Sequence, residues 1–134
     1  MDLIQKPQSE NSIVDGSETT FMEDVVEESK KQPVIVDFWA PWCGPCKTLG
    51  PVLEAEVKVN ASNVKMVKID IDKNPSIAQQ MNIQSIPAVF AFIDGQPVDG
   101  FQGAKTPAEI RDFVKKVISL GPNSKEEEGL DAAI

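Results

Sequence analysis

Two cysteines separated by two residues are the strongest chemical signal in this 134-residue chain. Cys43 and Cys46 are its only cysteines, and they stand within the run WCGPCK at residues 42–47. Exchange between a dithiol and a disulfide needs one thiolate that attacks and a second thiol that resolves the mixed disulfide. Two intervening residues on the first turn of a helix bring both thiols together, so the spacing indicates a redox-active pair.

The two cysteines are expected to have different roles. Cys43 should lie at a helix N-terminus, where free backbone N–H groups and the helix dipole favour the thiolate and lower its pKa. Cys46 follows three residues later on the same helix face, one turn further in, and should be less exposed. We therefore predict that Cys43 attacks the substrate and that Cys46 resolves the intermediate.

Other interpretations of the pair are a structural disulfide, an inert buried pair and metal ligation. A bridge around a two-residue loop removes little entropy from the unfolded chain, so it stabilises a fold poorly. The sequence has no histidine, the commonest general base and zinc ligand, and two thiols cannot complete a four-ligand zinc site in one chain. Redox chemistry is favoured, while a zinc or iron–sulfur site shared between two chains stays open.

Composition argues against several classes of partner. The chain has 13 basic and 21 acidic residues and a net charge of −8, whereas nucleic-acid binding depends on clustered Lys and Arg. No apolar run approaches the ~18–20 residues of a membrane span, so no membrane insertion is expected. The stretch from Met1 to Pro7 has neither a basic start nor an apolar core. It does not resemble a secretory signal, and a cytoplasmic location is the default expectation.

The strands that must position the cysteines are visible as apolar runs. Residues 33–40, directly before the cysteines, are almost continuously apolar, which is typical of a strand buried on both faces of a sheet. Further strands are predicted at Ile13-Val14, on an edge, and at 64–71, 88–93 and 96–101. Asp94-Gly95 between the last two is a strong hairpin signal.

Four helices are predicted between and after these strands. The first follows Thr20, which forms a capping-box pattern with Glu23, and ends near Lys30-Lys31. The second follows the cysteines and contains Pro51, which should kink it. A short third helix opens at Asn74-Pro75, with Asn as the cap. The fourth opens with the capping box of Thr106 and Glu109, carries an apolar stripe, and stops at Gly121-Pro122.

The order β-α-β-α-β-α-β-β-α predicts an α/β domain whose mixed sheet is covered by helices on both faces. We place this domain at residues 13–120, after a flexible polar arm at 1–12. Residues 121–134 form an acidic tail in which Ser124 and Glu127 make another capping-box pattern. That pattern predicts the beginning of a further helical region in a longer protein.

Residues 36–47, VDFWAPWCGPCK, resemble the active-site segment of the thioredoxin family. The similarity continues through Pro51, residues 68–72, 85–87, Asp94-Gly95 and Gly103-Ala104, and covers residues 13–119 in the order and spacing of the family. It implies the thioredoxin fold. It also implies a protein-disulfide reductase that works through a redox-active Cys43–Cys46 disulfide, with no cofactor and no metal.

The resemblance assigns roles to two charged residues. Asp37 matches the buried carboxylate that moves a proton to or from the resolving thiol. An Asp within that apolar strand should be desolvated and have a raised pKa, although a partly exposed strand position is the alternative. Lys68 matches the lysine that faces this carboxylate and tunes its charge. A solvated strand lysine is the alternative for Lys68.

A substrate-docking surface is also implied by the resemblance. Pro87 matches the cis-proline opposite the cysteines, and the backbone before it pairs with an extended substrate strand. Trp42 would be exposed beside the sulfurs, with a core position as its alternative, and Trp39 would pack beside the site. The docking residues so implied are Trp42, Gly44, Pro45, Ile86, Pro87, Gly103 and Ala104.

Two hypotheses about function follow. The first is a monomeric protein-disulfide reductase that is itself reduced by an electron donor resembling thioredoxin reductase; the Gly44-Pro45 pair between the cysteines is that of reducing members of the family. The second is the redox domain of a chaperone-like adaptor. Thioredoxin domains that precede tetratricopeptide repeats in bacterial co-chaperones are similar in layout, with an acidic helix directly after the domain. In that case the reading frame continues beyond Ile134 into such repeats.

Overall fold

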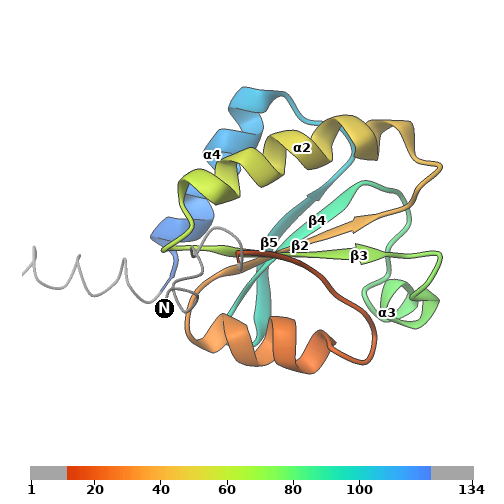
Figure 1. The fold of residues 1–134 in the computed structure, drawn as a ribbon, viewed down its shortest axis with the longest axis horizontal. Helices are drawn as coiled ribbons and strands as arrows, with labels where there is room; N and C mark the ends of the chain where they lie inside the picture. Colours follow the sequence, from red (N-terminus) through yellow and green to blue (C-terminus); the bar gives the residue numbers. More distant parts are fainter. Residues whose placement is uncertain (1–11, 122–134) are drawn as a thin grey trace, which may run out of the picture.

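The computed structural model describes residues 12–121, which form a five-stranded sheet in the order β1-β3-β2-β4-β5 (Figure 1). β1, β3 and β2 are parallel to one another, and β4 is antiparallel to both β2 and β5. The predicted mixed sheet is therefore confirmed. The strands are β1 (Ile13–Asp15), β2 (Val34–Trp39), β3 (Lys65–Asp70), β4 (Ala88–Ile93) and β5 (Gln96–Gln102).

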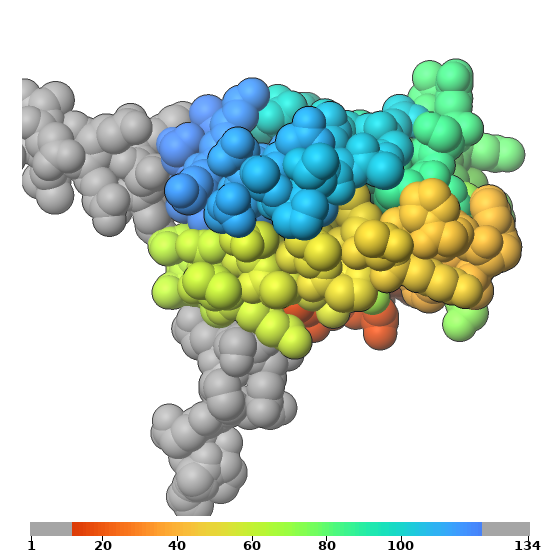
Figure 2. Space-filling model, turned by 90° about the horizontal axis from the view of Figure 1, so that it is seen from above, coloured from red at the N-terminus to blue at the C-terminus, as the bar shows by residue number. Residues whose placement is uncertain are grey.

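Helices cover both faces of this sheet, as predicted. Figures 1 and 2 show α2 and α4 side by side over one face, and Figure 1 shows the helical segment 22–30 on the other. The helical elements are η2 (Met22–Glu27), η3 (Glu28–Lys30), α2 (Gly44–Val59), α3 (Pro75–Gln80) and α4 (Pro107–Ser119).

The alternation of side chains along β2 produces two separate cores. Ile35 packs with α2 and α4, whereas its neighbours Val34 and Val36 pack toward η2 on the opposite face. By the same period Asp37 lies on the face beneath α2. On β3, Met66 belongs to the α2 core, so Lys68 also lies on that face. The sheet thus presents both predicted charged residues to α2.

Most of the turns and caps that the sequence predicted are present in the structure. Asp94 (φ 56°) and Gly95 (φ 82°) both have positive φ, as a tight two-residue hairpin requires, and they join β4 to β5. Thr106 accepts a hydrogen bond from the backbone N–H of Glu109, whose side chain accepts from the backbone N–H of Thr106. This capping box opens α4. Pro51 lies inside α2 as expected.

One predicted helix cap is wrong, and a second has the predicted position without the expected side-chain hydrogen bond. The hydroxyl of Thr20 accepts from the backbone N–H of Ser17 instead of capping the next helix, and the turns that follow are a π-helix and a 3₁₀-helix. Asn74 occupies the N-cap position of α3, as predicted, but its side chain makes no cap hydrogen bond, because its amide bonds the backbone of Glu18 and Asp70. The Glu18 carboxylate accepts from the N–H groups of Ser76 and Ile77 in its place. A residue 58 positions earlier in the chain thus performs the capping that the local pattern had assigned to Asn74.

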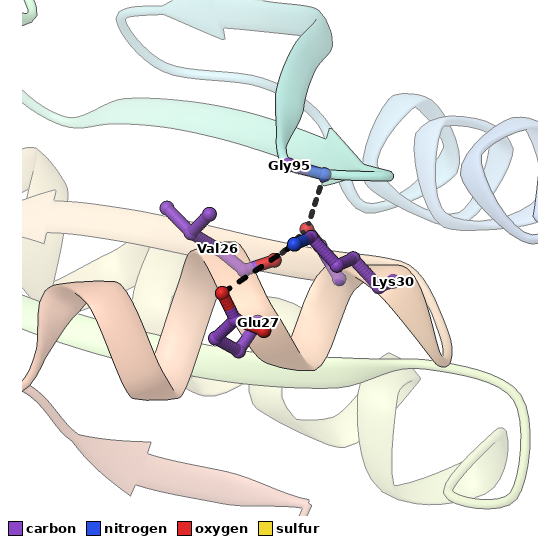
Figure 3. A network of polar contacts seen from close by, with 5 residues as sticks. Val26, Glu27, Lys30 and Gly95 are labelled. Carbon is purple, nitrogen blue, oxygen red and sulfur yellow. Dashed lines mark hydrogen bonds and ion pairs between the residues drawn. The ribbon is translucent and has the colours of Figure 1, made fainter.

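The β4–β5 hairpin is tied to η3 by a buried serine. Ser29 is fully buried; its hydroxyl donates to the carbonyl of Val26 (2.8 Å) and accepts from the N–H of Gly95 (2.8 Å) (Figure 3). Its carbonyl accepts from the N–H of Asp94. These hydrogen bonds attach the turn between β4 and β5 to η3.

The predicted arm and tail lie outside the described residues, apart from their inner ends. Ser12, placed in the arm by the sequence, is buried, and its carbonyl accepts from the N–H of Met66 at 2.6 Å. The pattern at Ser124 and Glu127 lies beyond the described part of the chain. Within residues 12–121, no helix is long and apolar enough to cross a membrane.

Candidate active site

Cys43 and Cys46 form a disulfide at the start of α2, with Cα atoms 5.3 Å apart. Cys43 is the N-cap of this helix and has extended backbone angles (φ −87°, ψ 108°). Its Sγ accepts a hydrogen bond from the backbone N–H of Cys46 at 3.2 Å. One of the free N–H groups of the helix N-terminus therefore points at the Cys43 sulfur, an arrangement that stabilises a thiolate there once the bond is reduced.

The predicted difference in exposure between the two cysteines is wrong for this oxidised state. Cys43 is 4% exposed and Cys46 6% exposed. Both cysteines belong to one buried cluster with Ala40, and Ile86 packs against this cluster. The difference between the two cysteines thus lies in their places on the helix, where Cys43 is the cap and Cys46 belongs to the first turn.

Asp37 is buried beneath α2, as the resemblance implied. It is 2% exposed, and its Oδ1 has no hydrogen-bond partner. Burial raises the pKa of this carboxyl to about 7; the positive charge of Lys68 opposes the rise and the negative charge of Glu54 adds to it. Asp37 and Cys46 line the same cavity of about 230 Å³. A carboxyl with a pKa near neutral pH and Cys46 therefore face the same cavity.

Lys68 is the Cα partner of Asp37 across the parallel β2–β3 pair. Its ammonium binds Glu54 of α2 (Nζ–Oε2 2.8 Å) and lies 5.4 Å from the centre of the Trp39 ring. Burial lowers the pKa of Lys68, but the hydrogen bond and the negative charge of Glu54 raise it above its ordinary value, and the negative charges of Asp37 and Asp15 add to the rise. Lys68 is thus paired, and the interpretation as a solvated strand lysine is wrong.

Trp42 is 66% exposed, so the alternative of a core position is wrong. Its indole N–H donates to the carboxylate of Asp72, 3.0 Å from Oδ2 and 3.3 Å from Oδ1. Trp39 is half buried and packs against the cysteine cluster, as expected. The exposed ring of Trp42 is therefore held beside the cysteines by one polar contact.

The Ile86–Pro87 peptide bond is cis, as the resemblance implied. Ile86 packs against the disulfide, and the Pro87 carbonyl accepts from the N–H of Gly103 at 2.8 Å. Gly103 has φ +93°, a conformation that favours glycine, and Ala104 beside it is exposed. Gly44 and Pro45 are also exposed, on the first turn of α2. The structure thus groups Asp37 and Lys68 with Cys46 around one cavity, places Ile86 against the cysteine cluster, and joins Pro87 to Gly103.

Two residues near the site were missed in the sequence. Glu54 lies eight positions after Cys46, and with Gly50 between them the three follow the i, i+4, i+8 spacing of one helix face. That spacing would have placed Glu54 beside Asp37. Asp72 follows the carboxyl end of β3, next to the end of β2 from which Trp42 extends. Neighbouring ends of parallel strands were the available signal for this pair.

Comparisons with known proteins decide the family. The thioredoxin family model matches residues 12–116. Thioredoxin 1 of Synechococcus elongatus is 48% identical over 100 residues, which cover 75% of this chain and 92% of that protein. Thioredoxin of Mycobacterium tuberculosis is 41% identical over 107 residues, covering 80% and 88%. The chain belongs to the thioredoxin family. A bifunctional thioredoxin reductase/thioredoxin of Mycobacterium leprae is 40% identical over 108 residues, 23% of its length.

As a member of this family, the chain is a thiol–disulfide oxidoreductase that reduces protein disulfides. Thioredoxins work through a redox-active cysteine pair without a cofactor, and Cys43 and Cys46 form that pair here. Among residues 12–121, no group of three or more metal-ligating side chains is found.

Proposed function

We propose that Cys43 is the nucleophile and Cys46 the resolving thiol of this oxidoreductase. In the reduced protein the Cys43 thiolate attacks one sulfur of a substrate disulfide, forms a mixed disulfide and releases the other sulfur as a thiolate. Cys46 then attacks the Cys43 sulfur, releases the second substrate thiolate and leaves the Cys43–Cys46 disulfide. Two electrons pass from the dithiol to the substrate, and the structure corresponds to the oxidised product.

The observation that carries this assignment is the hydrogen bond from the Cys46 N–H to the Cys43 sulfur at the N-cap of α2. A sulfur that accepts a backbone N–H at a helix N-terminus is stabilised as the thiolate. At neutral pH it is therefore the better leaving and attacking group of the two. Cys46 has no comparable position, because it lies within the first turn.

Asp37 is proposed as the group that accepts the proton of the Cys46 thiol during resolution. Its burial beside Cys46 and its pKa of about 7 support this role, because a base is most useful when its pKa lies near the working pH. Lys68 modulates the charge of Asp37 from the neighbouring strand. When the protein is reduced again, Asp37 returns the proton to Cys46.

Substrates are proposed to dock as an extended strand against the backbone of Ile86 and the cis-proline Pro87. The surface around the sulfurs would then be Trp42, Gly44, Pro45, Gly103 and Ala104. Its support is the half-buried Ile86 against the disulfide, the exposed Trp42 ring and the hydrogen bond that joins Pro87 to Gly103. Main-chain hydrogen bonds to an extended substrate strand, surrounded by apolar contacts, suit unfolded or flexible protein segments.

The proposed electron donor is an enzyme resembling thioredoxin reductase, and the protein that it reduces is proposed to be monomeric and cytoplasmic. A relative whose chain carries both activities, in Mycobacterium leprae, supports a reductase as partner. The acidic balance of the chain argues against a nucleic-acid partner.

Cys43→Ser and Cys46→Ser test these roles in the insulin-reduction assay with dithiothreitol. Cys43→Ser should abolish catalysis, and Cys46→Ser should accumulate the mixed disulfide on Cys43, visible by mass spectrometry. Insulin reduction by Cys43→Ser at the wild-type rate would overturn the proposal, as would a mixed disulfide trapped on Cys46 in that variant.

The adaptor hypothesis is not favoured. The curated relatives matched over most of their length are thioredoxins, which supports turnover rather than client holding as the main activity. A light-scattering assay of client aggregation with the redox-inactive double variant Cys43→Ser/Cys46→Ser would separate the two, because only an adaptor would suppress aggregation without its cysteines.

A further inference from the structure

Glu54 of α2 has no part in the mechanism proposed above, although it lies near the groups that carry it out. Glu54 lies on the α2 face that carries Cys46, and its carboxylate binds Lys68 at 2.8 Å. Both side chains are about one-quarter exposed, 25% for Glu54 and 26% for Lys68. They line the same cavity as Asp37 and Cys46. The ion pair therefore lies at the edge of the space that connects the carboxyl to the resolving sulfur.

The geometry around Asp37 shows what this ion pair prevents. Asp37 and Lys68 are direct neighbours on β2 and β3 and lie on the same face of the sheet, so Asp37 is a natural partner for the ammonium. Yet the Asp37 Oδ1 is buried without any hydrogen-bond partner, while the Lys68 Nζ bonds Glu54. A buried carboxylate oxygen without a donor is costly when charged, and it favours the protonated form.

We propose that Glu54 is a positioning residue of the redox centre, which holds the Lys68 ammonium away from Asp37 and so keeps the Asp37 proton exchangeable with Cys46. This inference rests on the proposed role of Asp37 as the proton acceptor. It adds a third charged group, on α2, to the pair on the strands. The signs of the charges agree, because Glu54 raises the pKa of Asp37 and Lys68 lowers it.

The other charged groups around Asp37 do not replace Glu54. From α2, Lys47 also lines the cavity, and it is exposed to solvent. From β1, Asp15 acts on Lys68, whose pKa it raises. On the other side, the partner of Asp37 on β4 is Val89, which is apolar and fully buried. Among the charged groups that line the cavity, only Glu54 holds the ammonium by a direct hydrogen bond.

The test follows the titration of the Asp37 carboxyl carbon by ¹³C NMR in the oxidised 134-residue protein. Glu54→Gln removes the negative charge and releases Lys68 toward Asp37. An opposite charge brought close to a carboxyl lowers its pKa, so the midpoint should fall by about one pH unit. Glu54→Asp retains the charge and should recover most of the wild-type midpoint. Glu56→Gln, on the same helix but not lining the cavity, makes the same charge change and should leave the midpoint unchanged.

A double variant tests whether Glu54 acts through Lys68. In a Lys68→Met background there is no ammonium to hold, so Glu54→Gln should move the Asp37 midpoint by less than half of its shift in the wild-type background. An equal shift in both backgrounds would overturn the positioning role. An unchanged or raised midpoint in Glu54→Gln itself would also overturn it, even with a lower Tm, because a merely structural residue would change Tm alone.

The rate of reaction provides a second readout. In Glu54→Gln, the pH at which insulin reduction reaches half of its maximum should fall with the Asp37 midpoint, whereas in Glu56→Gln it should not move. Failure of the proposed function would be seen differently, as wild-type insulin reduction by Cys43→Ser. The titration in the oxidised protein requires no turnover, so its outcome is independent of that result.

Discussion

The indole N–H of Trp42 donates to the carboxylate of Asp72, a residue 30 positions later, at 3.0 Å. This bond holds a ring that is 66% exposed at the rim of the disulfide. Trp42 follows β2 and Asp72 follows the neighbouring strand β3, so the contact spans the carboxyl ends of two parallel strands. The bond restricts the rotamers that the exposed Trp42 side chain can adopt.

Asp72→Ala should therefore weaken docking of protein substrates and leave the chemistry intact. Loss of one exposed, charge-assisted hydrogen bond corresponds to about 1 kcal/mol, or about a fivefold rise in KM for insulin. The kcat for insulin and the rate with a small aromatic disulfide should stay the same. Asp72→Asn retains an acceptor and should be intermediate, and Asp112→Ala on α4 serves as the control. An equal loss of rate with the small disulfide would show that Asp72 acts on the sulfurs instead.

The raised pKa of Asp37 predicts a pH-dependent stability. The unfolded carboxyl titrates near 3.8 and the native one near 7, so between these values the native state binds more protons than the unfolded state. The contribution of this carboxyl to the free energy of unfolding should be largest below pH 3.8. It should decrease as the pH rises toward and through 7. At pH 8 the ionised, buried carboxylate costs about 2–4 kcal/mol.

Asp37→Asn removes this titration while it preserves the shape of the side chain. In urea unfolding of the oxidised protein, the variant should be more stable than wild type at pH 8, and the difference should shrink as the pH falls below 6. Its resolution of mixed disulfides should be slowed. A difference in unfolding free energy that stays constant from pH 5 to pH 8 would contradict the raised pKa.

Ser29→Ala should destabilise the fold far from the redox centre. The substitution leaves the N–H of Gly95 without its acceptor and removes the bond to the Val26 carbonyl, both of which are partly buried (Figure 3). An unsatisfied buried donor costs about 1–3 kcal/mol. Ser119→Ala also removes a hydroxyl that donates to a backbone carbonyl, but on an exposed helix end, and should cost less than about 0.5 kcal/mol. Equal effects of the two substitutions would argue against the buried tether.

The sequence predicted the fold well because its strongest signals are local and repeated. The continuous apolar run before Cys43 is typical of a central strand, and Asp94-Gly95 is a strong hairpin signal; both elements formed. Where a local sequence pattern and a tertiary contact favoured different hydrogen bonds, the structure has the tertiary contact. Asn74 occupies the N-cap position of α3, but the side-chain hydrogen bond at this helix start comes from Glu18, which lies in the loop after β1 and supplies a carboxylate, a group favoured at a helix N-terminus.

The site was predictable where a single residue carries the chemistry, and less so where two distant residues share it. Asp37 stands out as a charge within an apolar strand, and its burial follows from that position. The Glu54–Lys68 and Trp42–Asp72 pairs join residues 14 and 30 positions apart, and charged partners are abundant in this sequence. Only the packing of α2 on β3, and the shared edge of β2 and β3, select these partners from the others.

Gln102 connects the two segments proposed to dock substrate. Its side-chain oxygen accepts from the hydroxyl of Ser85 (3.0 Å) and from the Ser85 backbone N–H (3.3 Å), two residues before the cis-proline. Gln102 ends β5 directly before Gly103, so these bonds and the Gly103–Pro87 bond hold the same two segments together.

Gln102→Ala should loosen the backbone that pairs with substrate. Two exposed hydrogen bonds are together worth about 1 kcal/mol, so KM for insulin should rise about two- to fivefold with little change in kcat. Gln102→Glu keeps an acceptor for both Ser85 donors and should restore most of the affinity. Gln96→Ala makes the same change at the other end of β5, far from the cysteines, and should have no effect. If Gln102→Ala leaves KM unchanged while hydrogen exchange at Ser85 accelerates, the tether orders the loop but does not contribute to docking.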